Sequence, residues 1–317
     1  MFAQHDNQDP SAALRAARRA TLAALLIAVP VAAQRAEPTY TIQKADGYVA
    51  HVHRPAGNTR APVVMLVGGS GGGIGWQDYM ADLLAKRGIV GVAVGYFSYD
   101  SLPKDLERIP VEVFDRALAW VAKLPYVDRN RIGIGGVSKG SELALLLASM
   151  HPEIHAVAVF APSAVVWQSI APGYPKTSSW TLRGADVPYV PYGSVKAPKN
   201  TAEIYRAGLE HARLTDSLDR ATIQAEKING PVLLLSGRDD TLWPSPDMSA
   251  MIVERLRAHA FRFGVDEVVY EHAGHLISSI RDDDVTVRGG TKEGNDAAQR
   301  AGQVRFLEFF GKALAGR

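Results

Sequence analysis

The sequence predicts an α/β fold in which a mostly parallel β-sheet is covered by helices on both faces. Its 317 residues are 47% hydrophobic and 21% charged, a composition that allows a large domain with a sizeable buried core. Short, continuous apolar segments alternate along the chain with amphipathic segments of helical period. Strands that are apolar along their whole length are typical of parallel sheets buried on both faces.

The elements predicted for the first half of the chain alternate regularly. Residues 41–55 form one or two edge strands that turn at Asp46 and Gly47. The following strands have the sequences APVVMLV (61–67), IVGVAVGY (89–96), RIGIGG (131–136) and IHAVAVF (154–160). The helices between them have the sequences GWQDYMADLLAKRG (75–88), PVEVFDRALAWVAKL (110–124) and SELALLLASM (141–150).

A long segment, residues 163–229, interrupts this alternation. It is rich in tryptophan, tyrosine and proline, and it becomes more helical from 201 to 221. The remaining elements have the sequences GPVLLLSG (230–237), a helix near 246–259, DEVVYEH (266–272) and a last helix ending in VRFLEFFGKAL (304–314). Because an insertion of this length in a compact domain is usually functional, we interpret it as a lid within a single domain of residues 34–317.

The N-terminus has the pattern of an export signal. Three arginines precede an apolar run, residues 21–33, that is shorter than the about 20 residues needed to span a bilayer. Small residues before Gln34 suit a cleavage site, so residues 1–33 are a predicted signal peptide. This predicts a periplasmic or secreted protein with no stable membrane span after the signal is removed. If the segment is instead an amphipathic surface helix, the protein is cytoplasmic.

Composition excludes several classes of function. A net charge of +2 with both signs spread along the chain implies no basic face for nucleic acid. The absence of cysteine excludes disulfides, thiolate metal sites and a cysteine nucleophile. The histidine pairs 51/53 and 151/155 have no evident third ligand, so no metal is predicted. Neither a dinucleotide nor a phosphate-binding glycine motif is complete, so no cofactor is predicted.

Two segments match the serine-nucleophile pattern G-x-S-x-G. One contains Ser70, within GGSGG (68–72), and the other contains Ser138, within GVSKG (136–140). In α/β-hydrolases the nucleophile lies on a sharp turn from a strand to a helix, where flanking glycines avoid clashes. Only Ser138 has a strand before it and an apolar helix directly after it. Ser138 is therefore the predicted nucleophile.

The glycine cluster around Ser70 then has a natural second role. An acyl-transfer intermediate carries an oxyanion that needs preorganised N–H donors. One donor is the backbone N–H of Lys139, the residue after the nucleophile, and the second comes from a loop after an earlier strand. Ser70 and Gly71 are the two candidates for that second donor, and a purely structural turn is the alternative. The Lys139 side chain either attracts an anionic leaving group or is a solvated charge.

The acid and the base follow Ser138 in the order typical of the fold. The segment SGRDDTLWP presents two acids, and the usual spacing of three residues from Gly237 selects Asp240 over Asp239. The segment EHAGHLI presents two histidines. His272 is expected to continue its strand and to point into packing, whereas His275 lies in the loop beyond. We therefore predict a triad of Ser138, Asp240 and His275.

Taken together, these motifs resemble one family from about residue 60 to the end. The segments GGSGGG, SYDSLPKDLERIPVEVFDRALAWV, IGGVSKGSELALLLAS, GRDDTLWPS and HAGHLI are similar to the C-terminal α/β-hydrolase domain of the acyl-CoA thioesterase and bile acid-CoA:amino acid N-acyltransferase family. The resemblance implies an α/β-hydrolase fold and a triad at Ser138, Asp240 and His275. It also implies hydrolysis or transfer of a thioester acyl group, and a serine in place of the transferases' cysteine favours hydrolysis.

Two departures separate the chain from that family. Animal members carry a β-sandwich domain of about 100 residues before the hydrolase, and the 29 residues from Gln34 to Pro62 leave no room for one. The predicted export signal is the second departure, because acyl-CoA is a cytosolic metabolite.

The function predicted from the sequence is therefore a serine hydrolase that cleaves a small-molecule acyl thioester or ester through an acyl-enzyme. An exported carboxylesterase or a dienelactone-hydrolase-like esterase is the first alternative. A ligand-binding protein that keeps the fold without catalysis is an alternative of another class.

Overall fold

The computed structural model describes residues 40–57, 59–278 and 288–315. The predicted signal peptide, residues 1–33, lies outside this range. None of the helices in the described part of the chain is long and apolar enough to cross a membrane.

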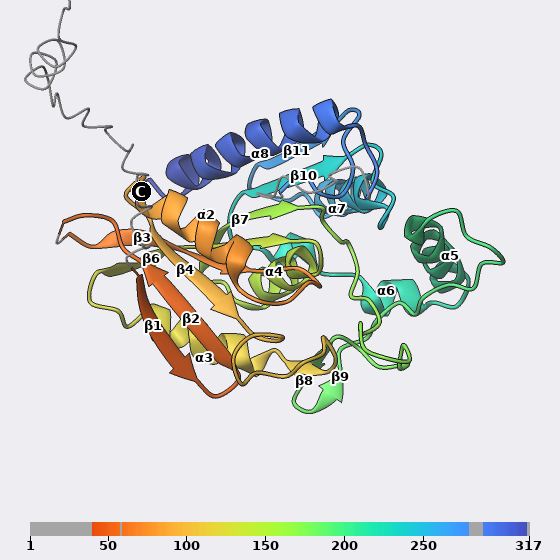
Figure 1. The fold of residues 1–317 in the computed structure, drawn as a ribbon, viewed down its shortest axis with the longest axis horizontal. Helices are drawn as coiled ribbons and strands as arrows, with labels where there is room; N and C mark the ends of the chain where they lie inside the picture. The colour runs from red at the N-terminus through yellow and green to blue at the C-terminus, as the bar shows by residue number, and fades with distance from the viewer. Residues whose placement is uncertain (1–39, 58, 279–287, 316–317) are drawn as a thin grey trace, which may run out of the picture. The chain divides into compact units, whose positions relative to one another are not determined.

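An eight-stranded sheet forms the centre of the fold, with the strand order β1-β2-β4-β3-β6-β7-β10-β11 (Figure 1). The strands of this sheet are β1 (Tyr40–Ala45), β2 (Tyr48–His53), β3 (Ala61–Val67), β4 (Val90–Gly95), β6 (Val127–Val137), β7 (Ile154–Phe160), β10 (Val232–Gly237) and β11 (Val265–Tyr270). β2 pairs antiparallel with both β1 and β4, and every pairing from β4 to β11 is parallel. The prediction of a mostly parallel sheet is confirmed.

Helices cover both faces of the sheet. They are α2 (Gly75–Ala85), α3 (Glu112–Val121), α4 (Lys139–Met150), α7 (Ser245–Ala258) and α8 (Lys292–Ala313). α2 and α8 share one face, where they run above the strands in Figure 1. α3, α4 and α7 pack on the opposite face. This two-sided cover explains why the parallel strands are apolar along their whole length.

The side chains of β3 alternate between the two hydrophobic cores on either side of the sheet. Val63, Met65 and Val67 belong to the core beneath α3 and α4, whereas Val64 and Leu66 belong to the core beneath α2 and α8. Successive side chains of a strand point to opposite faces, so a strand between two helical layers must be apolar at every position. The parallel strands all end at one edge of the sheet, and this edge carries the loops that hold Ser70, Ser138 and Asp240.

The segment 163–229 folds as an insertion between β7 and β10. It contains the short strands β8 (Trp180–Leu182) and β9 (Ala185–Asp186), which form a second sheet with β5 (Ile109–Pro110). Its second half contains α5 (Thr201–Leu214), α6 (Ser217–Ala221) and the 3₁₀ helix η1 (Ala225–Lys227), as the helical pattern from 201 to 221 predicted. Trp167 and Trp180 are wholly buried, so the base of the insertion is part of the core.

The structure defines where the last helix begins and where the last strand ends. The sequence predicted the last helix, α8, without a start; it begins at Lys292, where the Thr291 side chain accepts a hydrogen bond from the Gly294 N–H and caps the helix. The last strand ends at Tyr270, and His272 lies beyond it in a turn with a φ of 58°. The expectation that His272 continues the strand into packing was wrong, because its side chain is exposed.

Candidate active site

Ser138 occupies a strained turn between β6 and α4. Its φ of 57° and ψ of −124° lie in a region that residues other than glycine rarely adopt. A Cβ on Gly136 would overlap the Gly140 carbonyl, and a Cβ on Gly140 would overlap the carbonyls of Val67 and Gly68. Both glycines of the pattern are therefore required by the close approach of strand, helix and loop, as the sequence argument predicted.

Ser138, His275 and Asp240 form a continuous chain of hydrogen bonds. His275 Nε2 lies 2.9 Å from Ser138 Oγ, and His275 Nδ1 lies 2.8 Å from Asp240 Oδ2. All three residues are buried, with 7%, 4% and 5% of their surfaces exposed in that order. With the proton on Nδ1, the imidazole donates to Asp240 and its Nε2 accepts the serine proton. The structure thus brings together three residues selected from the sequence.

Four groups fix the Asp240 carboxylate. Oδ1 accepts the backbone N–H groups of Leu242 and Trp243, at 2.9 and 3.2 Å. Oδ2 accepts the Ser245 hydroxyl at 2.6 Å as well as the His275 imidazole. A carboxylate held by this many donors presents one oxygen to the imidazole in a fixed direction. The neighbouring Asp239 is exposed, which separates the two acids that the sequence left as alternatives.

Several backbone N–H groups near the Ser138 hydroxyl donate to no acceptor in the described part of the chain. Among the described residues, no hydrogen bond is found from the N–H of Lys139, or from those of Gly69, Ser70 and Gly71, whereas the Gly72 N–H donates to the Gly69 carbonyl. Gly69 is the loop residue that approaches Ser138, since a Cβ there would lie 3.1 Å from Ser138 Cβ. A Cβ on Gly71 would meet nothing within 4 Å. Ser70 and Gly71 stay predictions as the second oxyanion donor.

The Lys139 side chain is buried and forms an ion pair. It is 1% exposed, and its Nζ lies 2.8 and 2.7 Å from the two carboxylate oxygens of Glu142, which is wholly buried. The interpretation of this side chain as a solvated charge was therefore wrong, and attraction of a leaving group stays a prediction. The helical spacing of three residues places the ammonium and the carboxylate on one side of α4, where each offsets the other's loss of hydration.

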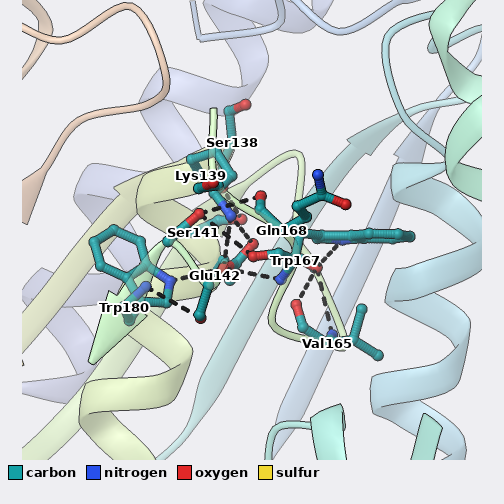
Figure 2. A network of polar contacts seen from close by, with 12 residues as sticks. Ser138, Lys139, Ser141, Glu142, Val165, Trp167, Gln168 and Trp180 are labelled. Carbon is teal, nitrogen blue, oxygen red and sulfur yellow. Dashed lines mark hydrogen bonds and ion pairs between the residues drawn. The ribbon is translucent and has the colours of Figure 1, made fainter. Parts of the chain in front are cut away.

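Burial opposes ionisation of both partners. Loss of hydration lowers the pKa of Lys139 and raises the pKa of Glu142, while the opposite charge of the partner acts in the other direction for each. The Glu142 carboxylate gains further stabilisation from the Trp180 indole N–H, which donates to Oε1 at 2.7 Å, and from the Trp167 backbone N–H at 3.3 Å. Figure 2 shows Lys139, Trp167 and Trp180 converging on Glu142, with the Ser138 hydroxyl pointing away from them.

Sequence reasoning missed Ser245 and the Glu142 network. Ser245 is five residues from Asp240, and nothing in a single sequence distinguishes it from other helix-initiating serines. Glu142 did carry a signal, because it is the acidic residue of a helix that is otherwise almost wholly apolar. A buried carboxylate needs partners, and Lys139 at a spacing of three is the obvious one.

Three of the four histidines considered as metal ligands lie within hydrogen-bonding distance of carboxylates. His51 Nδ1 and His53 Nε2 both lie within hydrogen-bonding distance of the Asp78 carboxylate, at 2.8 and 3.0 Å. His151 lies 2.9 Å from Asp115. Within the described ranges, no group of three or more histidine, aspartate or glutamate side chains is arranged to hold a metal ion.

Residues 109–279 match the family model described as "BAAT / Acyl-CoA thioester hydrolase C terminal". Among curated proteins, the chain is 29% identical over 282 residues to mouse (Mus musculus) acyl-coenzyme A thioesterase 6, which covers 83% of this chain and 62% of that protein. It is 30% identical over 224 residues to human (Homo sapiens) acyl-coenzyme A thioesterase 1, covering 68% of this chain and 49% of that protein. The chain thus spans only about half to three-fifths of the length of these relatives.

Solved structures share the fold at low sequence identity. An acylaminoacyl peptidase of Pyrococcus horikoshii has a TM-score of 0.58 and 17% identity, over 89% of this chain and 42% of that one. A Klebsiella pneumoniae protein described as a dienelactone hydrolase has a TM-score of 0.54 and 18% identity, over 86% and 98% of the two chains. The fold is that of an α/β-hydrolase, as the sequence predicted.

Proposed function

The chain belongs to the BAAT / acyl-CoA thioester hydrolase family, and from this premise we propose that it is a serine hydrolase that cleaves acyl thioesters of the acyl-coenzyme A class. The proposal assigns nucleophile, base and acid to Ser138, His275 and Asp240. It assigns the oxyanion donors to the N–H of Lys139 and to one N–H of the loop that contains Ser70 and Gly71.

Acylation begins with Ser138. Its Oγ forms a bond to the thioester carbonyl carbon while its proton passes to His275 Nε2, 2.9 Å away. The carbonyl oxygen becomes an oxyanion, and the N–H groups of Lys139 and the loop stabilise it. The C–S bond then breaks, and the thiolate leaves with the proton from His275. Asp240 stabilises the imidazolium and keeps its Nδ1 directed at Oδ2.

Deacylation repeats these roles with water. His275 takes a proton from a water molecule, whose oxygen attacks the acyl carbonyl carbon. The resulting oxyanion occupies the same donors, and collapse returns the proton to Ser138 Oγ and releases the carboxylic acid. No step needs an oxidant or a second substrate beyond water, and His275 carries each proton transfer.

One observation carries the proposal: a serine at a φ of 57° is hydrogen-bonded to a buried histidine that is itself bonded to a buried aspartate. A strained residue is retained where the surrounding structure requires it. The membership in the family then supports the thioester as the substrate class. A serine at position 138 supports hydrolysis over transfer to an amino acid.

The insertion 163–229 is proposed to act as the lid over the acyl chain. The ring of Trp243 packs edge-on against His275 at a centroid distance of 5.8 Å, and Tyr205 of α5 packs edge-on against Trp243 at 5.8 Å. These aromatic contacts connect the insertion to the base. They support an apolar wall beside the reacting carbonyl.

A matched-pair assay tests the substrate class. One acyl chain is offered to the full chain both as a coenzyme A thioester and as an oxygen ester, with Ser138→Ala as the control. We expect the thioester to be favoured by more than about tenfold in kcat/KM, equal to ~1.4 kcal/mol in the transition state. Preference for the oxygen ester would identify an esterase with the same machinery. Absence of turnover with both substrates would overturn the proposal and favour a binding protein.

A further inference from the structure

The Glu142 carboxylate contacts three parts of the molecule that the proposed reaction must hold together. It lies on α4, in the first turn after Ser138. Its oxygens bind the ammonium of Lys139, whose own backbone N–H is a proposed oxyanion donor. Its Oε1 also binds two separate points of the insertion, the Trp180 indole N–H and the Trp167 backbone N–H (Figure 2).

The contact with Trp180 connects Glu142 to the glycine loop, residues 68–72, which contains Ser70 and Gly71. The Trp180 ring packs against the Tyr96 ring at a centroid distance of 5.9 Å. The Tyr96 hydroxyl donates a hydrogen bond of 2.7 Å to the carbonyl of Gly68, at the start of that loop. Tyr96 is 1% exposed and burial raises its pKa, so the hydroxyl remains a donor at any ordinary pH.

The contact with Trp167 connects Glu142 to His275, the proposed base. The Trp167 ring packs edge-on against Tyr205 at 4.7 Å, and Tyr205 packs against Trp243, which packs against His275. Trp167 and Trp243 are buried to 0% and 1% exposure. In a close-packed interior, such contacts transmit a displacement of one ring to the next.

These contacts form a closed series around the site. Ser138 is joined through α4 to Glu142, and Glu142 is joined through Trp167 and the rings of Tyr205 and Trp243 to His275. The 2.9 Å hydrogen bond from His275 to Ser138 closes the series. We propose that Glu142 is a positioning residue for the reaction, which sets the distance between nucleophile and base and the placement of the glycine loop. This inference rests on the proposed role of Ser138.

A merely structural carboxylate would act differently. If Glu142 only stabilised the fold, its removal would reduce the fraction of active protein and leave each folded molecule fully reactive. If Glu142 positions the site, every folded molecule would react slowly. Titration of Ser138 with a fluorophosphonate separates the two cases, because it gives both a labelled fraction and a rate constant, and it requires no knowledge of the natural acyl group.

The test variant is Glu142→Gln, which keeps the shape of the side chain and removes its charge. We expect complete labelling of Ser138, with a rate constant lower by about tenfold or more. The kcat should fall by a similar factor, and KM should change less than about twofold. Labelling of a reduced fraction at the wild-type rate, or wild-type values throughout, would overturn the inference.

Glu112→Gln is the matched control. The Glu112 carboxylate also accepts a backbone N–H of the insertion, that of Arg183 at 2.6 Å, but it lies on α3 and not on α4, the helix that follows Ser138. We expect this variant to keep the wild-type rate constant. An equal fall in the labelling rate constant of both variants would mean that losing any carboxylate contact with the insertion slows Ser138, which contradicts a specific role for Glu142.

A milder variant covers the case in which Glu142→Gln does not fold. Trp180→Phe removes the indole N–H that Glu142 accepts and keeps a ring against Tyr96. Loss of this hydrogen bond should slow the labelling of Ser138 by about threefold, and an unchanged rate would overturn the inference. Wild-type protein that labels at Ser138 but does not hydrolyse acyl-coenzyme A would instead overturn the proposed substrate. Wild-type protein that does not label at Ser138 would overturn both.

Discussion

The two segments that match G-x-S-x-G, residues 68–72 and 136–140, have the same pattern and opposite environments. In the second, both glycines touch backbone atoms, the serine is 7% exposed at a φ of 57°, and a helix begins at the next residue. In the first, Ser70 is half-buried, Gly71 is exposed, and the next helix starts only at Gly75. The difference shows that the same five-residue pattern forms a turn directly between a strand and a helix in one segment only, so the pattern alone does not select the proposed nucleophile.

Exchanging each serine for alanine gives the largest expected contrast. Ser138→Ala removes the proposed nucleophile and should lower kcat by about 10³-fold or more. Ser70→Ala keeps the backbone N–H of the loop and should lower kcat/KM by less than about threefold. Steady-state hydrolysis of an activated thioester measures both variants. A larger loss in the Ser70 variant would contradict the assignment of the two segments.

The residues that follow the two serines, Lys139 and Gly71, should differ in how much they contribute to the free energy of unfolding. Lys139→Met leaves the Glu142 carboxylate buried without its cation, and we expect the free energy of unfolding to fall by about 3–5 kcal/mol. Gly71→Ala, at the equivalent position of the other segment, adds a methyl group to open space and should change it by less than about 0.5 kcal/mol. Urea denaturation measures both changes.

A double variant checks the cause of the Lys139 effect. Lys139→Met with Glu142→Met removes both charges together, so most of the lost stability should return. Labelling of Ser138 should stay slow, as in Glu142→Gln, because the Glu142 carboxylate is still missing. Losses in the two single variants that simply add in the double variant would show that the two charges are not coupled.

The glycines give the smallest expected contrast in stability. Gly140→Ala forces a Cβ against the carbonyls of Val67 and Gly68, where the backbone must shift, and should destabilise the protein by about 2 kcal/mol. Gly73→Ala meets no atom within 4 Å but has a φ of 71°, so only the backbone strain of about 1 kcal/mol remains. Thermal unfolding measures both, and equal costs would mean that crowding at the nucleophile turn is unimportant.

The parts of the fold that a sequence predicts best are those that periodicity determines. The apolar runs 61–67 and 154–160 coincide with β3 and β7, because a strand covered on both faces is apolar throughout and polar at its ends. β8 and β9 have three and two residues, too short for any periodic signal. The exposed position of His272 depends on where β11 stops, which the apolar pattern does not mark.

The candidate site also contains residues that the sequence predicts and contacts that it does not. Ser138, Asp240 and His275 follow a fixed order and spacing relative to predicted strands, so their meeting could be predicted. The approach of Trp180 and Trp167 to Glu142 joins residues 38 and 25 positions apart through an irregular insertion, and no local pattern encodes it. For Lys139 the rule that charges at a helix start are solvated failed, because the insertion covers that end of α4.

The most direct test of the account is to locate the acyl group during turnover. Mixing the full chain with an acyl-coenzyme A, quenching in acid within the first turnover and mapping peptides by mass spectrometry would reveal the covalent intermediate. We expect the acyl mass on the peptide that contains Ser138 and none on the peptide that contains Ser70. In His275→Ala, acylation supported by external imidazole should leave more acyl-enzyme once the imidazole is removed. An acyl group on Ser70, or hydrolysis that persists undiminished in Ser138→Ala, would contradict it.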